Sequence, residues 1–479
     1  MSSTTPPTPV HRPIFLELSE GFADAVSPAN FPRHLVRFRN DAWAKRIGLD
    51  GLDEQAWRDR FARFLPFEGN LPEPLAIRYH GHQFRSYNPE LGDGRGFLYA
   101  QFEDLEDGRI LDLATKGSGQ TPYSRQGDGR LTLKGGVREI LATEMLEALG
   151  VYTSKTFSVI ETGESLTRYD EPSPTRACVL TRLGHSHIRF GCFQRHAFEK
   201  RFDRVEELMR YTVRHYMPSC LQKTTEHTAL AFLTRVTHQT AALCAQWLAA
   251  GFVHGVLNTD NMNVNGESFD YGPWRFLPTL DPNFVAAYFD QTGLYRYGNQ
   301  PGACLWNLSR LAETLLEFAP VSALTEVLQQ FDERLWVHVV LAYMDRLGVA
   351  SRGDEEDDAF IKEVLEFLQE SGMPYQQFFF DWYGGGASAS RAAGSPAGEF
   401  YDTPKFASLR KTLRRYEPVP EVDLSHAYWQ DRATPCDMLI DEVEAIWAPI
   451  AEQDDWSLLS HKIEDLRLMG QALGHGIAR

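Results

Sequence analysis

The stretch His-Gly-Val-Leu-Asn-Thr-Asp-Asn-Met at residues 254–262 is followed by Asp-Tyr-Gly at residues 270–272. It sets Asp260 and Asn261 side by side in a short polar loop, with Asp270 further along. Phosphoryl or nucleotidyl transfer needs a carboxylate that accepts the proton of an attacking hydroxyl. It also needs an amide oxygen and a second carboxylate that hold a divalent cation against the phosphates. The pattern is therefore kinase-like, although it is not a kinase signature, because the Asn follows the Asp directly. An Asn/Asp-rich turn between two strands is the alternative.

Composition indicates a globular protein with more than one packed unit. The chain has 479 residues, of which 43% are apolar and 12% aromatic, so it exceeds a single ordinary core and is not a disordered chain. Its net charge of −17 and isoelectric point near 5.4 argue against a general surface for nucleic acid or anionic membranes. This net charge does not exclude binding of ATP, because a few local Arg and Lys residues suffice to bind it.

Cysteine usage and hydropathy predict a cytoplasmic protein. The six cysteines show no CxxC or zinc-ligand spacing, which suits a reducing compartment; they are Cys178, Cys192, Cys220, Cys244, Cys304 and Cys436. Residues 1–13 lack the basic and apolar regions of a signal peptide. The longest apolar run, residues 243–257, is interrupted by Gln246 and His254 and is too short to span a bilayer.

A glycine-rich segment, Leu91-Gly-Asp-Gly-Arg-Gly96, precedes two predicted strands at residues 97–101 and 110–115. Gly92, Gly94 and Gly96 allow the backbone to turn sharply and approach a ligand, and Arg95 is available for a phosphate. An ordinary turn is the alternative.

Lys116 closes the second of these strands, at the start of another glycine-rich loop that runs to Arg130. An ammonium in this place can pair with phosphates. Glu139 lies near the start of a predicted helix at residues 137–149, where it could hold Lys116 as a helix glutamate holds the strand lysine of kinases. A solvated lysine and a glutamate that favours the first helical turn are the alternatives.

Arg182 and Arg189 follow predicted strands at residues 156–160 and 177–180. The planar guanidinium matches phosphate oxygens, so the two could cradle a terminal phosphate, although a pair of surface arginines is the alternative. Histidines also occur in two His-x-His patterns, at His80, His82, His185 and His187. We favour hydrogen-bonding or core roles for them over metal ligation, because acids in suitable spacing are missing.

After residue 200 the apolar spacing is helical, at residues 204–216, 228–250, 307–319, 322–346, 359–370 and 403–479. The helical pattern after residue 200 contrasts with the strand pattern between residues 75 and 183. This contrast predicts a smaller sheet-rich lobe and a larger helical lobe, with candidate site residues drawn from both. We divide the chain into an N-terminal segment (1–75), a sheet-rich lobe (76–190), a helical lobe with the catalytic loop (191–350) and a helical C-terminal extension (351–479). Within the extension, the low-complexity segment 384–398 is expected to be a flexible loop.

Taken together, the motifs resemble the selenoprotein O (SelO/YdiU) family. The matching pieces fall in order over residues 80–310: Gly81–Phe84, Leu91–Arg95, Lys116–Arg125, Gly127–Arg130, Arg138–Glu139, Ser186–Gly191, His254–Met262, Asp270–Pro273, Asn299–Pro301 and Leu305–Leu308. Any one of them could arise by chance, but the ordered set is specific.

The resemblance implies an α+β, two-lobed protein-kinase-like fold that binds ATP in a flipped orientation and transfers AMP to protein hydroxyls. It implies that Asp260 is the general base, that Asn261 and Asp270 hold Mg²⁺, and that Lys116, paired with Glu139, contacts phosphates. It also implies a nucleotide site lined by Gly92, Gly94, Arg95, Asp128, Gly129, Arg182, Arg189 and Asp270. Attack at the α-phosphorus expels pyrophosphate, a highly charged leaving group that needs such cations around it.

The chain departs from the family pattern at flanking positions. His80 stands where Ala is usual, Arg85 where Gly is usual, and Ala114-Thr115 where Leu commonly precedes the lysine. These are flanking changes and do not remove a charged residue of the motifs. Some relatives carry Cys or selenocysteine near the C-terminus, whereas the last cysteine here is Cys436, so no terminal redox switch is expected.

We therefore expect an ATP- and Mg²⁺-dependent protein adenylyltransferase that acts on Ser, Thr or Tyr hydroxyls, with no nucleic-acid or membrane partner. Three alternatives stay open: phosphate transfer by the same residues, UMP transfer from UTP with Mn²⁺, and a non-catalytic nucleotide-binding scaffold. The presence together of Asp260, Asn261, Asp270, Lys116 and Glu139 argues against a scaffold, which has no need of the base.

Overall fold

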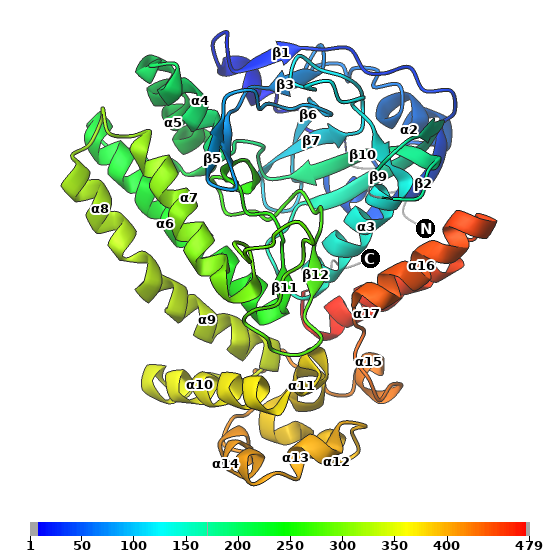
Figure 1. Ribbon diagram of the computed structural model, residues 1–479, viewed down its shortest axis with the longest axis vertical. Coiled ribbons are helices and arrows are strands. Elements are labelled where there is room, and N and C mark those ends of the chain that lie inside the picture. Colours follow the sequence, from blue (N-terminus) through cyan, green and yellow to red (C-terminus); the bar gives the residue numbers. More distant parts are fainter. Residues whose placement is uncertain (1–7, 170, 476–479) are drawn as a thin grey trace.

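A computed structural model describes residues 8–169 and 171–475 of the chain. A sheet-rich lobe lies at one end and helices extend away from it (Figure 1). The prediction that no signal peptide is present concerns residues 1–13, of which residues 1–7 lie outside the described parts. Residues 476–479 at the C-terminal end lie outside them as well.

The main sheet is antiparallel, with strand order β1-β3-β6-β7-β10-β9-β2 and with β8 paired to β10. Its strands are β1 (Ala23–Ala25), β2 (Leu35–Arg39), β3 (Leu75–Ile77), β6 (Leu98–Glu103), β7 (Ile110–Lys116), β8 (Leu131–Thr132), β9 (Lys155–Leu166) and β10 (Thr175–Gly184). Two small hairpins are formed by β4 (Gly81–Gln83) with β5 (Ser86–Asn88), and by β11 (Phe252–Val253) with β12 (Arg275–Phe276). The predicted strands are thus present, and β1 and β2 bring the N-terminal segment into the same sheet.

Both faces of this sheet are buried. Successive strand residues point to opposite sides, so neighbouring residues enter two different cores. Val159 of β9 and Leu180 of β10 belong to the large core, whereas Ile160 and Val179 belong to a second core that also contains Trp57. The second core is covered by helices α1 (Asp41–Arg46) and α2 (Glu54–Phe61), and the other face by α3 (Leu133–Ala148). Helix α3 begins where the Thr132 side chain accepts a hydrogen bond from Gly135 N, an N-cap that stabilises the first turn.

The helical lobe is built around one long helix, α6, which packs against α7, α8 and α9. Its helices are α4 (Phe190–Phe198), α5 (Phe202–Tyr216), α6 (Thr225–Ala250), α7 (Gln300–Glu313), α8 (Val321–Gln329) and α9 (Phe331–Leu347), with short 3-10 turns η2 (Pro218–Cys220), η3 (Thr259–Asn261) and η4 (Tyr297–Asn299). Helix α6 ends at Gly251, whose φ of 66° is the left-handed conformation that glycine adopts without strain. The chain then enters β11 and the Asp260 loop. The smaller sheet lobe and the larger helical lobe are as predicted.

The largest differences from the predicted helices occur at two places. The helix expected at 307–319 starts earlier, at Gln300, because Pro301 fits its first turn, where no backbone donor is needed. The helix expected at 322–346 is two helices that meet at Gln330, where Phe331 turns fully into the core.

The C-terminal extension is helical, as predicted. It contains α10 (Asp354–Ser371), α11 (Tyr375–Trp382), η5 (Gly385–Ser388), α12 (Ala389–Ala393), α13 (Gly398–Tyr401), α14 (Pro404–Leu413), α15 (Ala427–Gln430), α16 (Ile440–Gln453) and α17 (Ser457–Ala472); the N-terminal η1 spans Ile14–Glu17. The segment 384–398, expected to be a flexible loop, carries the short helices η5 and α12. Ser388 and Ala392 are buried there, and Arg391 stacks 4.7 Å over the Trp429 ring, so tertiary packing overrides the low-complexity composition.

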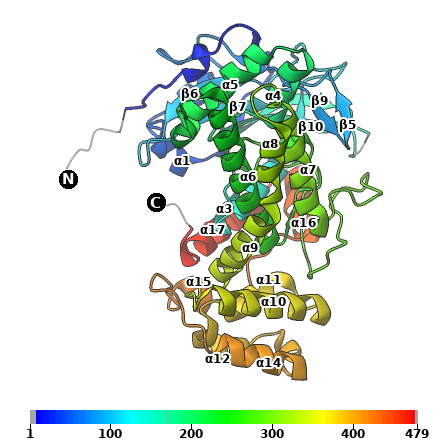
Figure 2. The same ribbon diagram turned by 90° about the vertical axis from the view of Figure 1, so that its left-hand side faces the viewer.

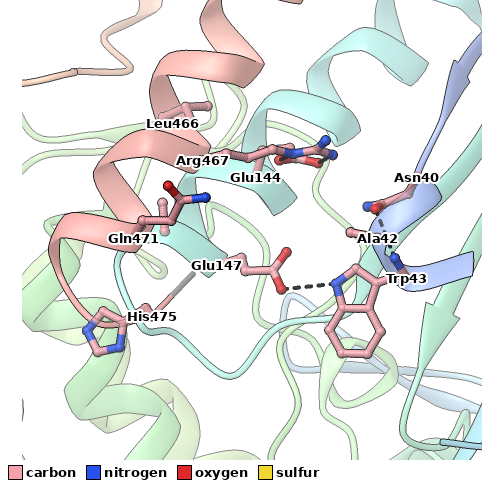
Figure 3. Close-up of a pocket in the computed structure, with 11 residues that line it drawn as sticks. Asn40, Ala42, Trp43, Glu144, Glu147, Leu466, Arg467, Gln471 and His475 are labelled. Atoms are coloured by element: carbon pink, nitrogen blue, oxygen red, sulfur yellow. Dashed lines mark hydrogen bonds and ion pairs between the residues drawn. The ribbon is translucent and has the colours of Figure 1, made fainter. Parts of the chain in front are cut away.

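Helices α16 and α17 return to the sheet lobe and lie beside α3 (Figures 1 and 2). The Arg467 guanidinium of α17 donates to both carboxylate oxygens of Glu144 on α3, at 2.7 and 2.8 Å (Figure 3). A cavity beside this pair is lined by Trp43, Glu147 and Gln471, among other residues. Within the described part of the chain, no helix combines the length and apolar character that crossing a membrane requires.

Candidate functional site

The two lobes meet at a cluster of charged side chains centred on Lys116. Lys116 is the last residue of β7, and its Nζ lies 2.5 Å from Glu139 Oε1 of α3 and 2.6 Å from Asp270 Oδ1 of the helical lobe. Both the lysine and the glutamate are buried, so each charge depends on the other. The predicted pair of strand lysine and helix glutamate is present, at the junction of the sheet-rich and helical lobes of this α+β fold.

Asp270 is held by cations from the sheet lobe. Besides Lys116, Arg182 of β10 places Nη2 3.2 Å from Asp270 Oδ1 and 3.9 Å from Glu139 Oε1. Burial by itself would raise the pKa of Asp270, but the charges of Lys116, Arg182 and Arg189 outweigh it and hold that pKa well below its usual range. Asp270 is therefore a carboxylate at any physiological pH.

Asp260 has the opposite environment. It lies in η3 with 8% of its surface exposed, and its Oδ1 accepts no hydrogen bond from any described residue. Burial raises the pKa of Asp260 to about 6, and the Asp270 charge adds to this, although Arg189 opposes it. A carboxylate with this pKa is suited to accepting a proton near neutral pH.

The Asp260 loop is positioned by the start of α4. Arg189, the residue before this helix, donates from Nη1 to the Asp260 carbonyl oxygen at 3.4 Å and forms a β-bridge with Asn263. The Phe190 amide donates to the Met262 carbonyl at 3.0 Å. The segment that carries Arg189 thus fixes the backbone of the candidate base.

Asn261 and Asp270 form a donor set that fits Mg²⁺. Asn261 Nδ2 donates to Asp270 Oδ2 at 3.2 Å, and Asn261 Oδ1 is buried without a hydrogen-bond partner in the described residues. An unpaired amide oxygen beside a carboxylate offers the hard oxygen ligands that Mg²⁺ prefers, with phosphates and water completing its shell. The residues present therefore suit the ion that the sequence predicted.

Arg189 has a partner that sequence reasoning missed. Its Nη2 lies 3.2 Å from Asp93 Oδ1, and its guanidinium stacks 4.5 Å over the Tyr79 ring and 5.0 Å over the Phe269 ring. Asp93 lies between Gly92 and Gly94, so the signal was the acidic residue within a motif that we considered only for its glycines and its arginine.

The glycines of residues 91–96 pack against protein in this structure. A Cβ on Gly92 would fall 2.3 Å from the Tyr123 ring, and one on Gly94 would fall 2.7 Å from the Tyr123 carbonyl oxygen. The two glycine-rich segments therefore pack on each other, which is a sufficient reason for glycine at both positions. Arg95 is exposed, and its carbonyl oxygen accepts from Gly117 N at 2.7 Å.

Asp128 and Gly129 do not contact the Lys116 cluster. Asp128 is exposed and pairs with Arg168 at 2.8 Å. Gly129 has φ of 68°, and a Cβ there would fall 2.2 Å from the Gly119 carbonyl oxygen. By contrast, Arg125 of the same loop was assigned no role from the sequence, yet its charge lowers the pKa of Asp260.

The four histidines have the hydrogen-bonding roles that we favoured. Their Nδ1 atoms contact Tyr87 (His80, 2.9 Å), Gln194 (His82, 2.9 Å), Tyr152 (His185, 2.6 Å) and Asp112 (His187, 3.3 Å). Residues 8–169 and 171–475 contain no cluster of three His, Cys, Asp or Glu arranged to hold a metal ion.

Known proteins are similar to this chain over most of its length. The profile of the family described as "Protein adenylyltransferase SelO" matches residues 8–467. The chain is 42% identical over 470 residues to "Protein nucleotidyltransferase YdiU" of Synechocystis sp., covering 95% of this chain and 98% of that protein. It is 43% identical over 475 residues to the protein of the same name from Gloeobacter violaceus, covering 95% of each.

Among solved structures, the chain is similar to ROP2 from Toxoplasma gondii, described as a virulence factor with a protein-kinase fold and no enzymatic activity. The TM-score is 0.26 with 9% identity, covering 72% of this chain and 82% of ROP2, which is too weak to bear on the fold. The family profile and the relatives, by contrast, extend over nearly the whole chain. This chain belongs to the SelO family of protein adenylyltransferases.

Proposed function

We propose that this protein transfers AMP from ATP to Ser, Thr or Tyr hydroxyls of other proteins and releases pyrophosphate. The observation that supports the proposal is the buried Asp260 carboxylate, whose Oδ1 accepts no hydrogen bond from any described residue and whose pKa is raised to about 6, beside the cations Lys116, Arg182 and Arg189. A binding scaffold has no use for such a group, because leaving it without a partner costs stability.

In the proposed reaction, Asp260 accepts the proton of the substrate hydroxyl as its oxygen attacks the α-phosphorus. The new oxygen–phosphorus bond forms while the bond to pyrophosphate breaks. Lys116, Arg182 and Arg189 would stabilise the negative charge that develops on the leaving group, since their side chains converge from β7, β10 and the start of α4. When bound by Asn261 and Asp270, Mg²⁺ would supply further neutralisation of the phosphates.

Glu139 orients rather than reacts in this scheme. Its contact with Lys116 Nζ keeps the ammonium at the junction of the lobes, next to Asp270. The exposed Arg95 and Arg125 are further candidates for nucleotide contacts, together with the backbone at Gly92, Gly94, Asp128 and Gly129. A cytoplasmic location is part of the proposal, supported by the six cysteines, all of which are buried and free.

The choice of AMP over phosphate is supported by family membership, because the same residues would also grip ATP for phosphate transfer. The test is the intact mass of the protein and of a mixed protein substrate after incubation with ATP and Mg²⁺, with UTP and Mn²⁺ as a parallel arm. A gain of one AMP, absent in Asp270→Ala, is expected. A gain of phosphate or UMP, or ATP binding without any gain, would replace the proposal with the corresponding alternative.

A further inference from the structure

An exposed aromatic surface lies next to the Asp260 loop. It consists of Phe84 and Arg85 at the tip of the β4–β5 hairpin, with Tyr288 and Phe289 from the segment before α7; we name it the hairpin-tip surface. We propose that the hairpin-tip surface docks an extended segment of the acceptor protein that carries an apolar side chain and a carboxylate close to the modified hydroxyl. This inference rests on the function proposed above.

The hairpin is attached directly to the loop that carries the base. The His82 amide donates to Thr259 Oγ1 at 2.7 Å, and the Phe84 amide donates to Asn258 Oδ1 at 3.0 Å. At the start of the hairpin, a Cβ on Gly81 would lie 3.3 Å from Asp260 Oδ1. A strand rises about 3.3 Å per residue, so the tip lies roughly 10 Å from the base, the reach of about three residues of an extended substrate.

The aromatic rings of this surface are exposed and contiguous. Tyr288 is 82% exposed, Phe289 44% and Phe84 41%. The ring centroids of Phe84 and Phe289 are 6.0 Å apart, and those of Tyr288 and Phe289 are 5.2 Å apart. Aromatic and arginine side chains are the types enriched in protein interfaces, and contiguous exposed apolar surface marks such sites.

The turn that presents Phe84 and Arg85 is strained. Both residues have positive φ, 49° and 65°, in a two-residue hairpin turn that normally selects Asn-Gly. Holding large side chains in this conformation costs conformational free energy. Neither side chain is fully buried: Arg85 is exposed, and Phe84 keeps 41% of its surface exposed although its ring lies 5.2 Å from that of Tyr295. A role outside the chain's own core gives a reason for the two residues.

The other half of the surface stands on a rigid base. The buried Asp290 carboxylate accepts hydrogen bonds from Leu294 N at 2.8 Å and from Tyr295 N at 2.7 Å. Tyr295 donates from its hydroxyl to Asn258 Oδ1 at 2.7 Å, and its ring lies 5.2 Å from that of Phe84. Both halves are therefore tied to Asn258, two residues before the base, and the surface is preorganised relative to the chemistry.

Charge defines the second feature of the docked segment. Arg85 is exposed and makes no ion pair with any described residue. Its guanidinium carbon lies 5.7 Å from the centroid of the Trp306 ring. The chain as a whole carries a net charge of −17, so it repels acidic partners except where a local cation faces them. A carboxylate beside the apolar residue of the acceptor complements this arrangement.

The test uses four synthetic peptides with one acceptor hydroxyl, in which the positions up to three residues on either side combine Phe or Ala with Glu or Lys. The wild-type protein, with ATP and Mg²⁺, is expected to adenylylate the Phe/Glu peptide with a kcat/KM higher than that of the Ala/Lys peptide by roughly tenfold or more. Arg85→Glu should reverse the preference for Glu over Lys. The double change Tyr288→Ala/Phe289→Ala should remove the preference for Phe. Leu341→Ala, at an exposed apolar residue of α9, is the matched control that should change neither.

The outcomes separate this inference from the proposed function. If AMP reaches neither the peptides nor a protein mixture, the proposed function fails. If AMP is transferred but the four peptides react equally, if proteins react and peptides do not, or if Arg85→Glu leaves the preference unchanged, the docking inference is wrong and the function stands. A wild-type dimer in sedimentation velocity that Phe289→Ala converts to a monomer would assign the surface to self-association and would also overturn the inference.

Discussion

Asp260 and Asp270 are carboxylates a short distance apart in the chain, yet their surroundings push their acidities in opposite directions. Burial raises the pKa of Asp260 to about 6, although the Arg189 charge opposes this shift, and Asp260 Oδ1 accepts no hydrogen bond from any described residue. Contacts with Lys116 and Arg182 hold the pKa of Asp270 well below its usual range. One carboxylate is thus suited to exchange a proton and the other to remain charged, which separates the role of base from that of metal ligand.

Activity should depend on pH through Asp260. The base works only when ionised, so kcat/KM should rise tenfold per pH unit in acid and level off above an apparent pKa near 6. Steady-state adenylylation rates from pH 4.5 to 8.5 at subsaturating substrate measure this. A profile that is flat between pH 5 and 8 would contradict the assignment of Asp260 as the base.

Stability should respond to the same group. The pKa of Asp260 is raised from 3.8 in the unfolded chain to about 6 in the folded protein, so the free energy of unfolding falls as pH rises through this interval and stays low above it. Asp260→Asn mimics the neutral form. It should raise the free energy of unfolding by about 2 to 3 kcal/mol at pH 7.5 and leave it unchanged at pH 4.

Urea unfolding at the two pH values tests this difference. Asp270→Asn is the matched comparison and should lower the free energy of unfolding at pH 7.5. The pKa of Asp270 is depressed in the folded protein, so its carboxylate stabilises the fold at any pH above its pKa in the unfolded chain. If Asp260→Asn instead lowered the free energy of unfolding at pH 7.5, the ionised Asp260 carboxylate would not destabilise the folded protein, and the prediction would be wrong.

Nucleotide binding should distinguish the two carboxylates as well. Asp260→Ala is expected to retain Mg²⁺-dependent ATP binding and to lose transfer, whereas Asp270→Ala should lose both, because it removes the metal ligand and leaves Lys116 and Arg182 without this partner. Calorimetric titration of each variant with ATP, with and without Mg²⁺, measures the binding. Equal transfer by Asp260→Ala and the parent protein would exclude the proposed base.

At the scale of elements, α3 links the site to the C-terminal extension. Glu139 on α3 contacts Lys116, while two other residues of the same helix pair with the extension: Lys134 with Glu444 of α16 at 2.7 Å, and Glu144 with Arg467 of α17 at 2.7 Å. The Glu144 side chain is only 5% exposed, so its charge depends on the bidentate guanidinium. Figure 3 shows this pair between the two helices.

Breaking the Glu144–Arg467 pair on one side should destabilise the protein. Arg467→Met leaves a buried carboxylate without its partner and should lower the free energy of unfolding by about 2 kcal/mol, less than for a fully buried pair because Arg467 is 36% exposed. The double variant Glu144→Gln/Arg467→Met should recover much of this loss, since no unpaired charge remains. Urea unfolding of the three proteins measures the coupling.

Arg201→Met is a matched control, because Arg201 pairs with Asp203 on the exposed surface and its loss should leave the unfolding midpoint unchanged. Additive effects of Glu144→Gln and Arg467→Met would mean that the two side chains do not act as a pair.

For the whole molecule, the junction between the lobes is polar and highly charged. Lys116 and Arg182 reach Asp270 across it, and Arg189 reaches the Asp260 backbone. In the proposed function the helical lobe would supply the metal ligands and the sheet lobe the cations, so a nucleotide bound there would contact both lobes at once.

ATP with Mg²⁺ should therefore raise the unfolding temperature of the whole protein in a single transition. At a ligand concentration of 100 times the Kd, the gain in the free energy of unfolding should be about 2.7 kcal/mol. Differential scanning calorimetry with ATP and Mg²⁺, ATP with chelator, and Mg²⁺ alone tests this. Asp270→Ala should abolish the Mg²⁺-dependent part, and stabilisation of only one of two separate transitions would argue against a site shared by the lobes.

The sequence by itself determined which residue types are available and where elements form. Hydrophobic periodicity located the strands β6, β7, β9 and β10 and most of the helices, because it depends only on the spacing of apolar residues that are close in the chain. The motifs also singled out Lys116, Glu139, Arg182, Arg189, Asp260, Asn261 and Asp270, which the fold brings into one cluster. Asp93 and Arg125 went unassigned because their roles depend on contacts distant in the chain.

Only the tertiary structure decided how these groups behave. It placed Lys116 between two carboxylates and buried Asp260 with Oδ1 unpaired among the described residues, so the two aspartates differ in acidity by environment and not by type. It also packed residues 384–398 into short helices and brought α17 back onto α3. Burial, charge proximity and packing are properties of space, and residues far apart in the chain meet only when the chain folds.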